Sequence, residues 1–298
     1  MICLFFLCSM LVAAADREMT SPALFPQTPP FFDKGYLIAR PQPSNRFTLF
    51  GRDGAQMFET SIVIPGRPNP SITRFAIDTG DRIAVGLAWQ TGGGIAFVDM
   101  TGKLTSFVDL GRYMPSKICF DTNHDLWAFG WQRDELVPAN ASATDYFQVR
   151  KFSKDGRPLG AFLPRGMFPR GLQPGNGVGI LAAAKDRIGM MAEPGMEGGH
   201  YEWIELDLDG NLIGRWELGG FTGGGWAFTA DGRLYTIMQQ DGNSRLMIFD
   251  RSRSEWRPSL TALPGDDYRR AGSLVGADGE DLVVWMTPPV SLAWFRPE

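Results

Sequence analysis

The chain repeats one hairpin pattern along most of its length, and this repetition restricts the fold more than any other feature. In each copy a short apolar strand meets a turn built from Asp, Asn, Gly or Lys, and a second apolar strand follows. Asp, Asn and Gly suit such tight turns because they tolerate positive φ and hydrogen-bond locally. The copies are "FAIDTGDRIAV" (75–85), "ICFDTNHDLWA" (118–128), "ILAAAKDRIGM" (180–190), "GWAFTADGRLY" (225–235) and "LVGADGEDLVV" (274–284).

A second pattern, an alternating strand that ends in a polar turn, lies between the copies of the first. Its members are "RFTLFGRDG" (46–54), "GIAFVDMTG" (94–102), "FQVRKFSKDG" (147–156), "YEWIELDLDG" (201–210), "RLMIFDRSR" (245–253) and "VSLAWFRPE" (290–298). A further strand follows most of them. The two patterns together predict a unit of four antiparallel strands, a-b-c-d, about 40–60 residues long, which is typical of a β-propeller blade.

The third strands predict an all-β propeller of six four-stranded blades, with five blades plus an extra hairpin as the alternative. Four blades are complete and cover about residues 67–111, 112–165, 172–220 and 221–265. The first partial blade, 36–66, holds b, c and d strands, and the last, 271–298, holds a, b and c strands. Partial blades at both ends suit a ring closed by terminal strands that complete each other's sheets. Either the segment 21–35 helps to close this ring, or the propeller has five blades with an extra hairpin.

Other architectures fit the pattern less well. A β-sandwich or jelly roll also uses short alternating strands, but it would not alternate two turn patterns five or six times. A parallel β-helix repeats over shorter periods, and an α/β fold needs helical periodicity that the chain lacks.

The N-terminal residues predict export. "MICLFFLCSMLVAAADRE" contains an apolar run that ends in Ala13-Ala14-Ala15, like a signal peptide cleaved after residue 15, although no Lys or Arg precedes the run. We therefore expect a signal peptide at 1–15, an N-terminal segment at 16–35 and the propeller at 36–298. No second apolar run is long enough to cross a membrane, so we expect no span in the mature chain. Cleavage would leave Cys119 as the only cysteine, and export without disulfides favours a periplasmic or extracellular bacterial protein.

Segments such as "GGWAFTADGRLYTIMQQDGNSRLMIFD" resemble blades of the six-bladed NHL-repeat propellers. More loosely, they resemble the senescence-marker-protein/gluconolactonase and strictosidine-synthase-like propellers. The gluconolactonase-type resemblance implies a divalent cation held in the channel by Glu, Asn and Asp. Those ligands cannot be matched residue by residue here, because the inner strands begin with "GNGVGI", "GGGW" and "AGSL".

Motifs for metals and catalysis are weak or missing. With only two histidines, His124 and His200, a multi-histidine metal site is impossible, and both are expected in solvated loops. The stretches "DTNHD" (121–125) and "DLDGN" (207–211) resemble the start of a calcium loop but lack its later glycine and acidic residue, so turn formation explains them better. No Walker loop or G-x-S-x-G elbow occurs. We predict no cofactor and no metal site, with calcium as the one alternative.

We expect Cys119 and the strand tryptophans to contribute to the packing of the fold rather than to a functional site. Cys119 falls on an inner strand, where burial as a small apolar residue explains it better than nucleophilic catalysis. The strand tryptophans are expected to pack between blades; they are Trp127, Trp131, Trp203, Trp226, Trp285 and Trp294.

Basic residues gather in the predicted d-to-a connections, which share one face with the b-to-c connections. The connections read from the pattern contain Arg67, Arg74, Arg112, Lys117, Arg165, Arg170, Arg269 and Arg270, against Asp266 and Asp267. Charges of one sign around a channel mouth favour anions, and the fork of arginine suits carboxylate or phosphate. We select Arg112, Arg165, Arg170 and Arg270 as ligand-binding residues. Acidic residues of the b-to-c loops on the same face oppose this effect: Asp134, Glu135, Glu193 and Glu197.

These features predict an exported scaffold that binds a protein or a small anionic ligand on its basic loop face, and they favour a protein that is not an enzyme. The net charge of −4 argues against a nucleic-acid partner. The alternative is a cation-dependent lactonase or hydrolase of the gluconolactonase-like type. Calcium would stabilise such an enzyme and EDTA would inactivate it, whereas a plain scaffold would respond to neither.

Overall fold

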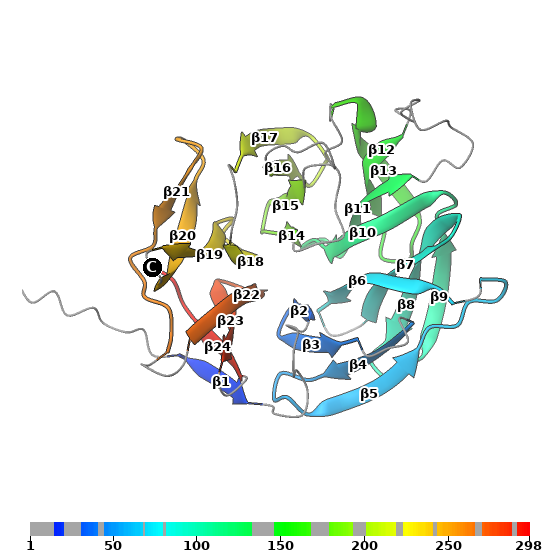
Figure 1. Ribbon diagram of the computed structural model, residues 1–298. Coiled ribbons are helices and arrows are strands. Elements are labelled where there is room, and N and C mark those ends of the chain that lie inside the picture. Colours follow the sequence, from blue (N-terminus) through cyan, green and yellow to red (C-terminus); the bar gives the residue numbers. More distant parts are fainter. Residues whose placement is uncertain are drawn as a thin grey trace, which may run out of the picture.

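The computed structural model shows a ring of antiparallel sheets around a central channel (Figure 1). The described residues are 15–20, 31–40, 45–67, 69–79, 82–132, 146–167, 179–192, 201–218, 223–240, 243–265, 270–287 and 291–298. The predicted signal peptide, residues 1–15, lies outside them except for its last residue. Within the described ranges, no helix has the length and hydropathy required to cross a membrane.

The first three blades each take their four strands from one continuous stretch of chain. Blade 1 contains β2 (Phe31–Asp33), β3 (Tyr36–Ala39), β4 (Arg46–Phe50) and β5 (Gln56–Ser61). Blade 2 contains β6 (Ser71–Asp78), β7 (Arg82–Trp89), β8 (Gly92–Asp99) and β9 (Leu104–Asp109). Blade 3 contains β10 (Tyr113–Phe120), β11 (Leu126–Gln132), β12 (Phe147–Phe152) and β13 (Pro158–Pro164), followed by the short 3₁₀ helix η1 (Arg165–Met167).

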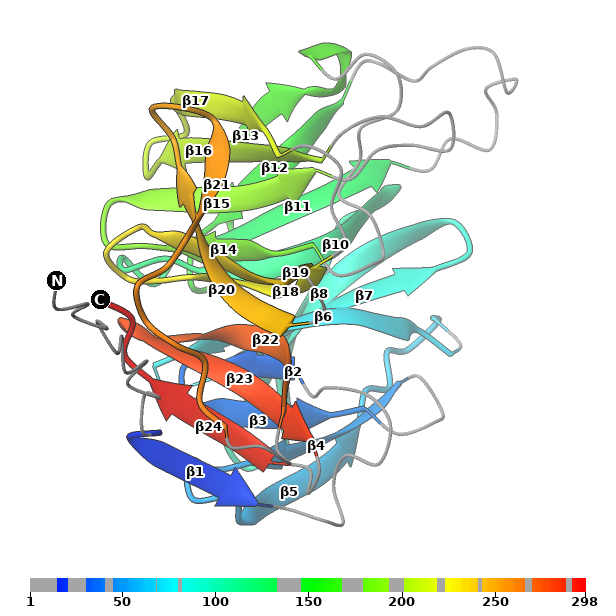
Figure 2. The same ribbon diagram turned by 60° about the vertical axis from the view of Figure 1, so that its left-hand side comes forward.

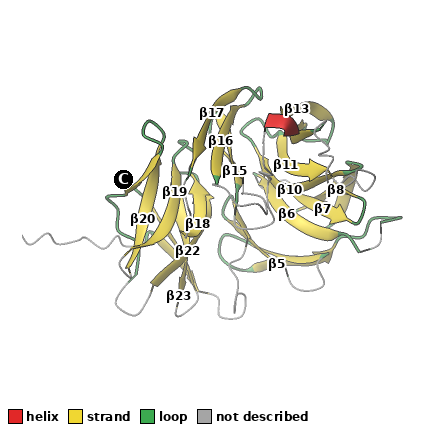
Figure 3. Cartoon of the chain, turned by 45° about the horizontal axis from the view of Figure 1, so that its top comes forward, coloured by secondary structure: helices red, strands yellow, loops and turns green. Residues whose placement is uncertain are grey.

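The last three blades complete the ring. Blade 4 contains β14 (Leu181–Ala183), β15 (Arg187–Ala192), β16 (Glu202–Asp207) and β17 (Leu212–Glu217). Blade 5 contains β18 (Gly223–Phe228), β19 (Leu234–Gln240), β20 (Asn243–Asp250) and β21 (Glu255–Pro258). Blade 6 contains β22 (Arg270–Asp278), β23 (Asp281–Thr287), β24 (Ser291–Phe295) and the N-terminal β1 (Arg17–Thr20). Figure 3 shows that strands make up nearly all the regular structure.

The ring closes through a strand from the other end of the chain. β1 pairs antiparallel with β24, with Arg17 opposite Trp294, and it forms the outer strand of blade 6 (Figure 2). The guanidinium of Arg17 also lies 4.5 Å from the centre of the Trp294 ring. The inner strand missing from the first partial blade is β2, in the proline-rich stretch before residue 36. The prediction of six blades is therefore confirmed, and the five-blade alternative is wrong.

The turns form where the sequence repeats predict them. In the c-to-d turns of blades 2 and 4, the carboxylates of Asp99 and Asp207 accept hydrogen bonds from backbone N–H groups two and four residues later. The glycines of these turns, Gly102 and Gly210, have φ of 89° and 92°, which other residues adopt only at a cost. The hydrogen bonds that these two carboxylates accept hold their pKa below the ordinary value.

The core lies between neighbouring blades, and the tryptophans contribute to it as predicted, with one exception. Trp203 of blade 4 packs edge-on against Phe228 of blade 5, with 5.1 Å between ring centres. Trp127 is fully buried and stacks on Phe162. Trp131 differs, because it is half-buried at the end of β11 and lines a cavity on the loop face.

Hydrogen bonds link the a-to-b turns of neighbouring blades around one mouth of the channel. They connect blades 1 to 6 in sequence, from one turn or inner strand to the next. The pairs are Ile77 N to Asp33 Oδ2 (2.6 Å), His124 Nδ1 with Asp78 Oδ1 (2.6 Å), Thr122 Oγ1 to Lys185 O (3.1 Å), Lys185 N to Ala230 O (3.0 Å) and Ala230 N to Gly279 O (2.8 Å). His124 is thus exposed, as expected of a loop residue, but tied to a buried carboxylate.

Candidate ligand-binding site

Two inner strands carry a β-bulge near their first residues. In β6 the register with β7 shifts between Ile72 and Arg74, so that Thr73 is the extra residue. In β10 the register with β11 shifts between Pro115 and Lys117, so that Ser116 is the extra residue. A bulge redirects the side chains beside it, and here a basic residue directly follows each bulge.

The two bulges are bonded to each other across the boundary between blades 2 and 3. The Thr73 hydroxyl donates a 2.5 Å hydrogen bond to the carbonyl oxygen of Pro115. This bond fixes the bulge of β6 against the backbone of β10. Arg74 and Lys117 are therefore placed on the same cavity by neighbouring strands.

That cavity, which we call the basic cavity, has a volume of about 470 Å³ and lies between the first three blades. It is lined by ends of strands on the face of the d-to-a and b-to-c connections. Its cationic residues are Arg40 after β3, Arg74 in β6 and Lys117 in β10. Among the described residues that line it, none is acidic, and Ser71, Thr73 and Ser116 add hydroxyl groups.

The cations of the basic cavity lie close enough to influence one another. The guanidinium groups of Arg74 and Arg40 lie 4.7 Å and 5.8 Å from the centre of the same ring, Phe31. Burial lowers the pKa of Arg74 to about 10; Asp33 raises it and Arg40 lowers it further. Arg74 therefore remains protonated near neutral pH. Lys117 is 2% exposed, so its charge acts in surroundings of low dielectric.

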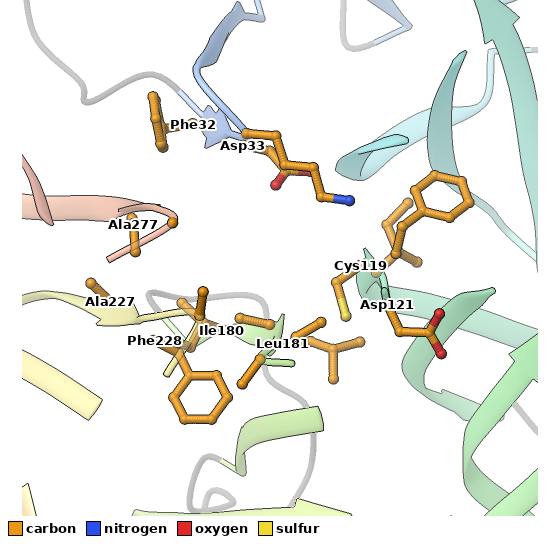
Figure 4. Close-up of a pocket in the computed structure, with 18 of the residues that line it drawn as sticks. Phe32, Asp33, Cys119, Asp121, Ile180, Leu181, Ala227, Phe228 and Ala277 are labelled. Carbon is orange, nitrogen blue, oxygen red and sulfur yellow. The ribbon is translucent and has the colours of Figure 1, made fainter. Parts of the chain in front are cut away.

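A second cavity, the channel cavity, is also about 470 Å³ and is lined by all six inner strands (Figure 4). Arg74 lines both cavities. In Figure 4 the polar residues Asp33, Cys119 and Asp121 come from blades 1 and 3, whereas blades 4 and 5 present apolar residues such as Leu181 and Phe228.

Two acidic groups of the channel cavity, a carboxyl and a thiol, both have raised pKa values. Burial raises the pKa of the Asp33 carboxyl, although Lys34 and the hydrogen bond from Ile77 oppose the shift. Burial also raises the pKa of the Cys119 thiol well above its ordinary value, and Asp33 and Asp121 add to this. Cys119 is 8% exposed, and a thiol held protonated in this way is a poor nucleophile.

The predicted binding residues lie apart from the basic cavity or outside the description. Arg112 is exposed in the turn between β9 and β10, and Arg165 is half-buried at the start of η1; neither lines the basic cavity. Arg170 lies outside the described residues. Arg270 begins β22, but its side chain is not described. The acidic loop residues Asp134, Glu135, Glu193 and Glu197 also lie outside the described ranges.

The residues of the basic cavity were only partly visible in the sequence. Arg74 and Lys117 were counted among the basic residues of the connections, but they lie inside the inner strands β6 and β10. Arg40 was missed because it follows a b strand, and only the topology brings it beside β6. One signal was present: a proline within a strand, Pro115, indicates a bulge.

The two calcium-like stretches form turns. Asp121 Oδ1 accepts hydrogen bonds from the backbone N–H groups of Asn123 and Asp125, and Asp121 Oδ2 accepts one from Trp127 Nε1. Asp207 is bonded in the same way within its own turn. In the described part of the chain, no three His, Cys, Asp or Glu side chains gather where they could hold a metal ion.

Comparison with known proteins supports the fold alone. No sequence profile of a known protein family matches this chain, and no curated protein sequence matches it. A solved gluconolactonase from Xanthomonas campestris matches with a TM-score of 0.55 and 16% identity, over 95% of this chain and 91% of the other. This chain has the fold of a six-bladed β-propeller. A propeller of the nidogen/laminin complex (TM-score 0.48, 12% identity, 84% of each chain) and a luciferin-regenerating enzyme (0.48, 14%, 86% of this chain and 82% of the other) match less well.

Proposed function

We propose that this propeller is an exported binding protein that takes up a small anionic ligand on its loop face, with the basic cavity as the site. One observation carries the proposal: blades 1, 2 and 3 each contribute a cation, Arg40, Arg74 and Lys117, to a single cavity. Arg40 lowers the pKa of Arg74, as expected for two cations that repel, and a bound carboxylate or phosphate would reduce this repulsion. The Ser116 hydroxyl, which also lines the cavity, would supply a further hydrogen-bond donor.

The physical argument favours a compact anion with several oxygen atoms. Guanidinium groups bind carboxylate and phosphate oxygens in pairs, whereas a lysine acts as a point charge. The partly enclosed setting strengthens these contacts relative to water. Pockets of this volume are typical of small-molecule sites.

Isothermal titration calorimetry with inorganic phosphate and citrate, at low and at physiological ionic strength, tests the proposal. We expect salt-sensitive binding, and we expect Arg40→Gln and Lys117→Gln each to weaken it about tenfold or more, since each removes a hydrogen bond to a charged group. The matched control is the Arg112/Arg165/Arg170 triple alanine variant, which removes basic residues of the rim. This control should bind as the wild type does.

If the triple alanine variant loses binding while Arg40→Gln and Lys117→Gln keep it, the ligand binds at the loop arginines that the sequence predicts. Absence of any salt-sensitive anion binding by the wild type would refute the function itself. Thermal unfolding of each variant checks that a loss of affinity does not follow from a loss of fold.

Export is tested separately. Protein from the envelope fraction of the source cells should begin at Asp16 when its N-terminus is sequenced, because we place cleavage after Ala15. Recovery of chains that begin at Met1 in the cytoplasm would contradict export.

A further inference from the structure

The lining of the channel cavity is divided between two chemistries. Blades 1 to 3 contribute the ionisable residues Asp33, Lys34, Arg74, Asp121 and His124, together with Cys119. Apart from Lys185 at the mouth, blades 4 to 6 contribute apolar residues and glycines to the lining, and the apolar residues form a wall. Its members are Ile180, Leu181, Ala182, Ala183, Trp226, Ala227, Phe228, Val275 and Ala277. A cavity filled by water alone would gain nothing from such a wall, whereas a molecule with one polar end and an apolar body would fit both sides (Figure 4).

The charge on the polar side favours an anionic end. The Asp121 carboxylate is occupied by three donors of its own turn and strand, and Lys151 lies 3.7 Å from it. The Asp33 carboxylate accepts the N–H of Ile77, so it too has a hydrogen-bond partner within the protein. Three Lys and Arg side chains, Lys34, Arg74 and Lys185, line the cavity against these two carboxylates.

The cavity reaches solvent on the face opposite the basic cavity. Exposed residues of the a-to-b turns, Thr79, Thr122 and Lys185, line its outer part. The inner part is lined by the middle of the inner strands, including Arg74 and Leu181. A ligand can therefore enter between the a-to-b turns without passing through the loop-face site.

We propose that the channel cavity is a second binding site, for an amphipathic monocarboxylic acid whose carboxylate contacts Lys34 and Arg74 and whose hydrocarbon body lies against the wall of blades 4 to 6. The site shares Arg74 with the proposed anion site but depends on different residues otherwise. Lys34 lines only the channel cavity, whereas Lys117 and Arg40 line only the basic cavity. The proposal rests on the proposed function only through Arg74, so the two can be tested apart.

The test is a calorimetric titration of the full chain with acetate, hexanoate and decanoate, and with inorganic phosphate in parallel. Burial of methylene groups should raise the carboxylate affinity about three- to fourfold for each one that contacts the wall. Lys34→Gln should weaken decanoate binding about tenfold and leave phosphate binding unchanged. Lys117→Gln should do the reverse.

A substitution on the apolar wall provides the matched pair. Ala183 is half-buried and faces the channel cavity, so Ala183→Asp should abolish the gain in affinity with chain length, while Ala183→Val should keep it. Affinity that does not depend on chain length, or decanoate binding that Lys117→Gln removes and Lys34→Gln spares, would overturn the channel site. The phosphate titrations judge the proposed function independently of that outcome.

Discussion

Blades 2 and 3 can be compared with blades 5 and 6, because all four inner strands are irregular near their first residues. In β6 and β10 the extra residues are Thr73 and Ser116, and each is followed by a cation. In β22 the first of two extra residues is Gly272, and in β18 the register shifts across a run of glycines. At this level blades 2 and 3 line the basic cavity, whereas in blades 5 and 6 the backbones of β18 and β22 lie in contact.

The glycines explain the difference. β18 and β22 form a parallel bridge between Gly225 and Leu274 that joins blades 5 and 6 into one eight-stranded sheet. A Cβ atom on Gly225 would lie 1.9 Å from the carbonyl oxygen of Leu274, and one on Gly224 would lie 2.6 Å from that of Gly272. A register shift near the start of an inner strand therefore brings two backbones into contact where its residues are glycines. It places side chains on a cavity where its residues carry them.

The largest expected effect comes from breaking the glycine contact. Gly225→Ala should lower the free energy of unfolding by about 3 kcal/mol or more, because it adds overlap with a backbone carbonyl to the strain of a φ of 77°. Gly111→Ala is the matched control, with a φ of 60° and no atom within 4 Å of the added Cβ, and it should cost about 1 kcal/mol. Urea denaturation measures both. Equal losses would mean that the two blades do not depend on this close approach.

A smaller effect is expected at the boundary of blades 2 and 3. Thr73→Val keeps the shape of the side chain but removes its hydrogen bond to Pro115 O, which should cost about 1 kcal/mol and loosen phosphate binding at the basic cavity. Directly after the first bulge of β22, the Ser273 hydroxyl bonds weakly, at 3.2 Å, to the carbonyl of the next residue in its own strand. Ser273→Ala should therefore change stability less than Thr73→Val does. The reverse order would show that the cross-blade bond does not hold the site.

The contrast also explains what sequence can predict in this fold. The blades were predictable because each hairpin has its own local sequence pattern of alternating apolar residues and a polar turn, such as the one at Asp207. The short strands β1 and β2 were not placed, because four and three residues carry little pattern and their partners are set by ring closure. The positions of Arg74 and Lys117 depend on bulges, and the sequence does not show which side chain a bulge will turn toward the basic cavity.

The smallest effect concerns the channel wall beside Arg74, and it depends on pH. Burial raises the pKa of Asp33 above its ordinary value of 3.8, so between these two pKa values the folded chain binds more protons at this residue than the unfolded chain does. The free energy of unfolding then falls as pH rises through that window. Asp33→Asn removes this slope and can still accept the N–H of Ile77. The variant should gain stability relative to wild type as pH is raised from 3 to 8.

Asp207→Asn supplies the control of opposite sign, because the hydrogen bonds of its turn lower the pKa of Asp207. Its contribution to stability is present above the ordinary pKa of 3.8 and is lost as pH falls through the lowered pKa of the folded chain. Asp207→Asn should therefore lose stability relative to wild type as pH is raised, while Asp33→Asn gains it. Denaturation curves collected at several pH values distinguish the two slopes. Parallel slopes would mean that burial in the channel does not set Asp33 apart from a carboxylate in an exposed turn.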